Sequence, residues 1–228
     1  DAPLIDLGRG YNFANAGTIN VQGDGSVAIS GGTTSYTVQL VNSGTINVGT
    51  EQGKADGSNG EGLIGIKGNG SATTINNTKD GVINVYADNS WAFGGSTKAI
   101  VNNGIINLLC NIGCEIYAPN TTGTRNSQDG TADIIVPVAS ATPGQGNVPA
   151  APVNAVSQQK LTNYTIGTNS DGSSGTLKAN NLVISDNVKV NTGFSAGTAD
   201  TTVVIDDVFK GENISGAENI TCLLYTSP

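Results

Sequence analysis

A five-residue phrase recurs four times in the first half of the chain: Gly, any residue, Ile, Asn, then Val or Leu. Its copies occupy residues 17–21, 44–48, 81–85 and 104–108. The central isoleucines lie 27, 37 and 23 positions apart, and removing insertions leaves a unit of about 23 residues. A repeat of this length is typical of folds in which small units stack on one another.

Each unit contains three short apolar segments, illustrated by residues 36–40, 45–48 and 63–66. Their apolar residues alternate with polar ones and are mostly β-branched, while Gly, Asn, Asp and Ser fill the gaps. This is the pattern of strands and turns. One such unit cannot enclose a core by itself. The sequence therefore predicts an all-β fold, a right-handed parallel β-helix with three short strands in each coil.

The repeat divides the chain into four regions. Regular coils are expected over residues 1–118, and because the chain begins inside the pattern we expect it to be a fragment. Residues 119–160 contain several prolines, which cannot donate to a strand ladder, so we expect a Pro/Gly-rich loop or irregular coil there. Further coils without the phrase are expected over residues 161–221. The tail, residues 222–228, is out of character and is a candidate non-native segment.

The charge of the chain argues against two kinds of partner. The 228 residues carry a net charge of −8, include ten Lys and Arg, and have a pI near 4.3. The basic residues do not cluster, whereas a nucleic-acid binder has a basic stripe. No apolar run approaches the roughly 18 residues that a membrane span needs. We expect neither nucleic-acid binding nor direct membrane insertion.

Alternation within the repeated phrase assigns its two faces. The Ile and Val of each copy point inward, and the Asn between them points outward. In stacked coils these amides align about 4.8 Å apart, in an outward ladder formed by Asn20, Asn47, Asn84 and Asn107. A second column is expected from the turn residues Asn15, Asn42 and Asn102. Stacked amides can bind sugars or stitch one coil to the next, and we favour the stitching.

The same alternation places the only tryptophan. Trp91 and Phe93 share phase with Ile64 in one direction and with Cys114 and Ile116 in the other. We therefore expect Trp91 in the core rather than on a binding surface.

Cys110 and Cys114 lie four residues apart across a turn. This spacing predicts a small local disulfide in an oxidising compartment. The alternative is a thiol pair on a metal. The chain has no histidine and no second cysteine pair, which argues against that alternative because structural zinc takes four ligands. We expect no metal and no cofactor.

Residues 51–61 form a polar, glycine-rich insertion without an apolar anchor. Insertions in repeat folds become loops along one edge, where partners often bind. The side chains available for such binding are Glu51, Lys54, Asp56, Asn59 and Glu61. The alternative, which we favour, is a tolerated loop that binds nothing.

Catalytic chemistry finds no support in the sequence. Without histidine, no Ser-His-Asp or Cys-His arrangement exists. Carbohydrate-cleaving enzymes use paired carboxylates, and the nearest candidate pair is Asp206 with Asp207. Adjacent strand residues point to opposite faces, so these two do not easily share a substrate. The chain is expected not to be an enzyme.

Several segments resemble the passenger domains of Gram-negative autotransporters, the surface proteins of type V secretion. The resemblance rests on the phrase Asn-x-Gly-Thr-Ile-Asn-Val and on residues 63–68, 164–168 and 191–203. It implies an adhesin-like β-helix at the bacterial cell surface or in the medium, exported through the outer membrane. The roles it implies are adhesion, aggregation and biofilm formation. Partners would be surface glycans of host or bacterium, matrix proteins, or further copies of the chain.

Two other functions stay open at this point. A β-helical stalk could hold a secreted protease away from the membrane and bind nothing itself. A β-helix could also degrade polysaccharides. A protease domain preceding this segment would favour the stalk, and the release of reducing ends from glycans would favour the enzyme.

Overall fold

The computed structural model describes residues 3–31, 36–57, 60–127, 133–135, 159–161, 164–167, 177–178, 182–195, 208–210 and 213–225. Strands make up nearly all regular structure in these ranges, with two short 3-10 turns, η1 (Lys54–Gly57) and η2 (Ala217–Asn219). Among the described residues, no helix has the length and apolarity needed to cross a membrane. The prediction of an all-β fold is confirmed.

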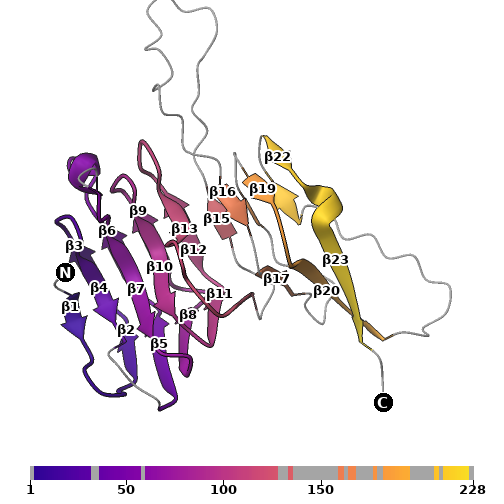
Figure 1. The fold of residues 1–228 in the computed structure, drawn as a ribbon, viewed down its shortest axis with the longest axis horizontal. Coiled ribbons are helices and arrows are strands. Elements are labelled where there is room, and N and C mark those ends of the chain that lie inside the picture. Colours follow the sequence, from indigo (N-terminus) through magenta and orange to yellow (C-terminus); the bar gives the residue numbers. More distant parts are fainter. Residues whose placement is uncertain are drawn as a thin grey trace, which may run out of the picture.

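Three sheets run along the stack, and each of the first five coils gives one strand to each sheet (Figure 1). The first sheet contains β1 (Pro3–Asp6), β4 (Val27–Ser30), β7 (Ile64–Asn69), β10 (Trp91–Ser96) and β13 (Glu115–Tyr117). The second sheet begins with β2 (Phe13–Asn15), β5 (Val38–Asn42), β8 (Thr73–Asn77), β11 (Ala99–Asn102) and β14 (Thr124–Asn126). The third contains β3 (Thr18–Val21), β6 (Thr45–Val48), β9 (Val82–Val85), β12 (Ile105–Leu108) and β15 (Asp133–Ile135).

Later strands continue the stack. The second sheet goes on through β17 (Tyr164–Ile166), β20 (Val188–Ser195) and β23 (Ile220–Tyr225). Smaller sheets are formed by β16 (Gln159–Leu161), β19 (Leu182–Ile184) and β22 (Ile214–Ser215), and by β18 (Leu177–Lys178) with β21 (Phe209–Lys210). Neighbouring strands in all five sheets pair in parallel. The prediction of a parallel β-helix is confirmed, and Figure 1 shows the rungs following one another along the longest axis.

The four copies of the repeated phrase lie over one another in the third sheet. Ile19 pairs with Ile46, Ile46 with Ile83, and Ile83 with Ile106. The last three are fully buried, and burying an isoleucine side chain contributes roughly 1.5–3 kcal/mol. Each phrase therefore anchors its coil to the next, while the insertion that contains η1 lies in the connection between β6 and β7.

A second apolar column follows the second sheet. Leu40, Ile75 and Ile100 pair in register and are fully buried. The next two positions of this column are Arg125 and Tyr164, which are also buried. A charged side chain thus occupies a place that the preceding coils give to an aliphatic one.

Strict alternation fails in the first sheet. Gly65 and Ile66 are adjacent and both buried, and so are Ala92 and Phe93. Because successive side chains of a flat strand point to opposite faces, two adjacent inward residues require the strand to bend. Trp91 precedes this bend and is only half-buried. The prediction of a core tryptophan is therefore wrong.

The bend also shifts the predicted pairing by one residue. Trp91 pairs with Glu115 and Phe93 with Tyr117, where the sequence pointed to Cys114 and Ile116. Both of the latter residues are buried. Alternation with a period of two residues no longer identifies the inward-facing residues once a strand bends at a corner of the coil.

The described parts of residues 119–160 belong to the stack. β14 extends the second sheet and β15 extends the third. In residues 222–228, Cys222 lies in β23 and pairs with Val190. The division of the chain into four regions, and the origin of its tail, stay predictions. Asp206 and Asp207 lie outside the described residues.

Candidate functional site

The outward amides of the repeated phrase form a continuous hydrogen-bonded ladder. Asn47 donates from Nδ2 to Oδ1 of Asn20 at 2.8 Å. Asn84 donates to Asn47, and Asn107 to Asn84, both at 2.9 Å. Asn20 is exposed and the other three are half-buried. A carboxamide has two N–H donors, and the ladder uses one from each of Asn47, Asn84 and Asn107 and none from Asn20.

A second ladder lies inside the coil corner between the second and third sheets. Asn15 donates to Asn42, Asn42 to Asn77, and Asn77 to Asn102, each at 2.9 Å from Nδ2 to Oδ1. All four are buried. These amides are out of reach of a ligand, so this column stitches coil to coil. Donation runs toward later coils here, whereas in the outward ladder it runs toward earlier ones.

Sequence reasoning missed Asn77. The other members of the inner ladder lie four positions before the central isoleucine of their phrase, but Asn77 lies six before Ile83. Lys79 and Asp80 are the two inserted residues. Allowing for that insertion, which the apolar spacing already showed, would have placed Asn77 in the column.

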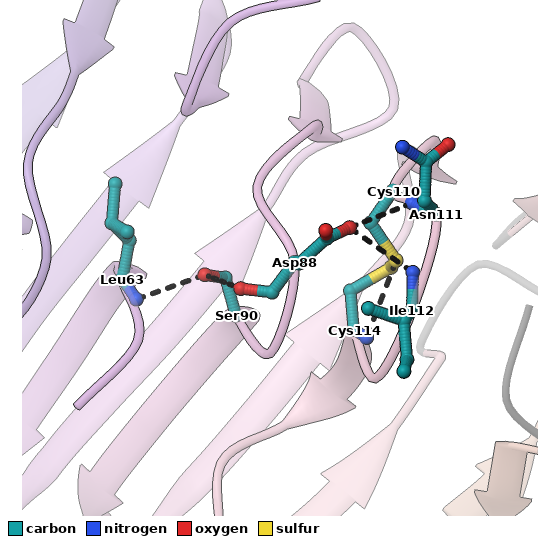
Figure 2. Close-up of a disulfide and its surroundings, with 7 residues drawn as sticks. All are labelled: Leu63, Asp88, Ser90, Cys110, Asn111, Ile112 and Cys114. Carbon is teal, nitrogen blue, oxygen red and sulfur yellow. Dashed lines mark hydrogen bonds between the residues drawn. A yellow bond between two sulfur atoms is a disulfide. The ribbon is translucent and has the colours of Figure 1, made fainter. Parts of the chain in front are cut away.

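The structure joins Cys110 and Cys114 in a disulfide with an S–S distance of 2.04 Å (Figure 2). Both cysteines are buried. The loop they close rests on Asp88 of the preceding coil, whose Oδ1 accepts the backbone N–H groups of Asn111 at 2.8 Å and Ile112 at 3.0 Å. Asp88 therefore fixes the loop, a role that its sequence position alone did not indicate.

Ser90 continues this stitching toward the coil before. Its hydroxyl donates to the backbone carbonyl of Asp88 at 2.9 Å and accepts the backbone N–H of Leu63, also at 2.9 Å (Figure 2). Three successive coils are thus linked by polar contacts on the edge that carries the disulfide. The arrangement positions backbone and leaves no reactive thiol at this edge, which gives it a structural role.

The insertion residues are not gathered into one site. Lys54, the first residue of η1, forms an ion pair at 3.1 Å with Glu51, which precedes η1 in the chain. Glu61 instead lines a separate cavity of about 230 Å³ with Val27, Ile64 and Lys67 among others. Asn59 lies outside the described residues, and only the backbone of Asp56 is described.

A larger cavity, of about 410 Å³, lies where the chain leaves β13 and turns toward β14. Its wall consists of residues 115–121 and Arg125. The turn at its rim is closed by the Thr121 N–H, which donates to the Ala118 carbonyl at 3.2 Å. Pro119 and Asn120, with φ of 63° at the asparagine, fill the central positions, as a type II turn requires. The cavity therefore has a rim of defined shape.

Arg125 is the notable side chain in this cavity. It is 4% exposed, and its guanidinium carbon lies 4.4 Å from the centre of the Tyr117 ring. Its terminal nitrogens donate to the carbonyls of Thr121 at 2.8 Å and Gly123 at 3.2 Å. Its Nε has no acceptor, and in the described part of the chain no carboxylate forms an ion pair with it.

Two ionisable groups share the cavity with Arg125. Burial raises the pKa of Glu115 above its ordinary value. Burial also raises the pKa of Tyr117, against the opposing effect of the Arg125 charge. Sequence reasoning missed this cluster, because its members come from the stretch where the repeat fades. An arginine at the place of an inward aliphatic residue was the one available signal.

Fold and site together define a parallel β-helical repeat protein with ordered amide columns and a cationic cavity at one corner. Within the described ranges, no group of three or more Cys, Asp or Glu side chains is arranged to hold a metal ion.

Comparison with known proteins relates the chain to BigA. Residues 1–113 match the family model described as "BigA fourth domain", and residues 163–226 match "BigA beta sandwich domain". A protein of Salmonella typhimurium strain LT2, named "Putative surface-exposed virulence protein BigA", is 72% identical over 221 residues. That match covers 97% of this chain and 11% of the relative. No solved structure matches the chain.

The name of the second family model implies a different fold from the one that the strand pairing shows. The model is described as a beta sandwich, whereas strands β17, β20 and β23 in that region pair in parallel and extend the second sheet. The name of the Salmonella relative describes a surface-exposed protein, and the resemblance to autotransporter passengers stays a prediction.

Proposed function

We propose that the chain is a β-helical segment of a surface-exposed bacterial virulence protein and that it acts in adhesion, aggregation or biofilm formation without catalysing a reaction. The observation that carries this proposal is the 72% identity to the Salmonella BigA protein over 97% of this chain. Surface exposure and virulence are taken from the name of that relative. Adhesion is our extension of it.

The outward ladder supports a binding role. It repeats an amide in four successive coils in parallel register, exposed at Asn20 and half-buried at Asn47, Asn84 and Asn107. Each rung keeps an N–H donor for a hydroxyl or carbonyl of a partner. A single contact of this kind is weak, but repetition along one molecule and among many molecules on a cell raises the overall affinity. Suitable partners are surface glycans, matrix proteins or further copies of the chain.

We further propose export through the outer membrane as part of an autotransporter passenger, on the strength of the sequence resemblance. The disulfide fits this route, because its cysteines are only four positions apart and the bridge adds little width to an unfolded chain. The rival function is a stalk that binds nothing. It is favoured by the mutual hydrogen bonding of the ladder amides, which leaves each with only part of its bonding capacity.

Microspheres coated with the purified chain test the proposal. They are incubated with epithelial cells, with immobilised matrix proteins and with one another, and adhesion and clumping are counted against spheres coated with an unrelated β-helix. We expect adhesion or clumping well above that control. Spheres that neither adhere nor clump would favour the stalk, and release of reducing ends from glycans would favour the enzyme.

Matched triple variants locate the adhesive face. One variant carries Asn47→Ala, Asn84→Ala and Asn107→Ala in the outward ladder. The other carries Gln39→Ala, Thr74→Ala and Thr124→Ala, an outward column of the second sheet that is also in register. Loss of adhesion in the first variant alone assigns binding to the ladder. Equal adhesion of both variants assigns the ladder a structural role only.

A further inference from the structure

The cavity beside β13 contains the buried positive charge of Arg125, which forms no ion pair with any described residue. Arginine is almost never fully buried unless it is paired, because an isolated charge is costly to remove from water. Arg125 is 4% exposed and follows Ile100 in the inward column of the second sheet. The other buried charge among the described side chains is Asp88, whose carboxylate accepts two backbone N–H groups. Arg125 has two neutral backbone partners as well, the carbonyls of Thr121 and Gly123, and no carboxylate of the described residues pairs with it.

The contacts of Arg125 hold it in place but do not neutralise it. Two neutral carbonyls, of Thr121 and Gly123, accept from its terminal nitrogens, and the Tyr117 ring covers one face. A guanidinium has five N–H donors, so donors remain unused; Nε is one of them but is buried, so the terminal nitrogens are the groups that would meet a ligand. The side chain is thus fixed at the wall of a 410 Å³ cavity with its charge intact. Such a preorganised guanidinium suits a carboxylate, which it can bind through two parallel hydrogen bonds.

The other lining residues suit a sugar. At the rim, Asn120 provides an amide, and the Thr121 hydroxyl, which donates to the Ala118 carbonyl at 2.6 Å, can accept from a sugar hydroxyl. Burial favours the protonated form of Glu115, which can donate a hydrogen bond and repels an anion less. An extended peptide is less suited. β13 has only three residues, lies at the end of the first sheet as described, and is followed by Pro119.

We propose that this cavity binds the carboxylate of an acidic sugar unit, of the uronic or sialic acid class, with Arg125 as the anion-binding residue. This proposal rests on the proposed adhesive function. It extends that function by naming the chemical class of glycan that this corner of the β-helix would bind. Uronic acids occur in bacterial polysaccharides, and sialic acids occur in host glycans. The test distinguishes these two sources of an acidic sugar.

In the experiment, the purified chain is titrated with the methyl glycosides of glucuronic acid and of N-acetylneuraminic acid, and binding is measured by isothermal titration calorimetry. Methyl glucoside, the methyl ester of the glucuronide and sodium acetate are the controls. Fluorescence of Trp91 is a second readout, because this only tryptophan pairs in register with Glu115. We expect saturable binding of at least one acidic glycoside. The affinity for the uncharged sugars should be lower by about tenfold or more.

Variants then assign the binding to Arg125. Arg125→Lys keeps the charge but loses the fork geometry, and we expect it to weaken binding of the acidic sugar about tenfold. Arg9→Lys, at the only other arginine of the chain, should bind like the unaltered protein. Equal binding of charged and uncharged sugars overturns the proposal, as does no binding or an unchanged affinity of Arg125→Lys. The comparison of sugars needs no variant, so it decides the matter even if Arg125→Lys does not fold.

The result is separable from that of the microsphere assay. Adhering spheres with no acidic-sugar binding leave the adhesive function in place and remove this cavity from it. Acidic-sugar binding without adhesion keeps the cavity as a ligand site and removes the adhesive function.

Discussion

Asn102 accepts a hydrogen bond from Asn77 at 2.9 Å, yet its own Nδ2 has no acceptor. In the next coil Ile100 and Val101 pair with Arg125 and Asn126, which brings Ser127 to the position opposite Asn102. The Ser127 hydroxyl is likewise without a partner. The inner ladder therefore stops where a serine replaces the next asparagine.

Ser127→Asn should extend the inner ladder by one rung. The new Oδ1 would accept from Asn102, and satisfying a buried donor is worth about 1 kcal/mol. We expect a higher urea midpoint of unfolding with an unchanged slope. Ser127→Ala is the control and should not raise the midpoint. A destabilised Ser127→Asn protein would show that the corner lacks room for the longer side chain.

The two ladders should differ in what they contribute to stability. Asn42→Ala leaves a buried donor on Asn15 and a buried acceptor on Asn77 unsatisfied, so we expect a loss of about 3 kcal/mol. Asn47→Ala in the same coil should cost less than about 1 kcal/mol, because water reaches the half-buried outward amides. Chemical unfolding of both variants gives the comparison. Equal costs would contradict the division into a structural and an accessible ladder.

Removing the disulfide should destabilise the chain moderately. In the chain-entropy account, a bridge between residues four apart contributes about 2 kcal/mol by restricting the unfolded state. The double variant Cys110→Ser and Cys114→Ser should lose that amount in urea unfolding. Reduction of the unaltered protein should reproduce the loss, whereas reduction of the double variant should have no effect. Asp88→Asn should add to the loss by weakening the carboxylate contacts to the loop.

Glu115 should make stability depend on pH. Burial raises its pKa above the ordinary value of 4.5. The folded state then holds the proton more tightly than the unfolded state, so the contribution is full below that ordinary value and is lost as the pH rises through the folded pKa. Glu115→Gln cannot ionise, so its stability relative to the unaltered protein should increase between roughly pH 4 and pH 7. Urea midpoints across that range test this. A difference independent of pH would mean that burial does not disfavour the Glu115 charge.

The third sheet could be predicted residue by residue from the repeated phrase. Ile46 and Ile83 are inward and Asn47 and Asn84 are outward, because insertions lie in the connections and leave the two-residue period of the strands intact. The first sheet could be predicted only in outline. Trp91 lies at a bend where adjacent residues are both buried, so alternation alone misassigns it and its partner Glu115.

The cavity could not be predicted because it departs from the pattern that revealed the fold. Arg125 occupies a core position, and the turn through Pro119 and Asn120 carries no repeat signal. In the fold β14 stacks on β11, and Arg125 lies against the ring of Tyr117. Such local conflicts with an otherwise consistent pattern are where function is to be expected.

The opposed directions of the two asparagine ladders give the stack a polarity. Each amide column adds up small dipoles, and because donation runs toward later coils in one column and toward earlier coils in the other, their fields oppose each other. A coil added in the proper sense meets one donor and one acceptor. An outward amide could turn over to suit a reversed coil, but the inner amides of Asn15, Asn42 and Asn77 also donate to backbone carbonyls, so the inner column is the one that ties side-chain direction to backbone direction.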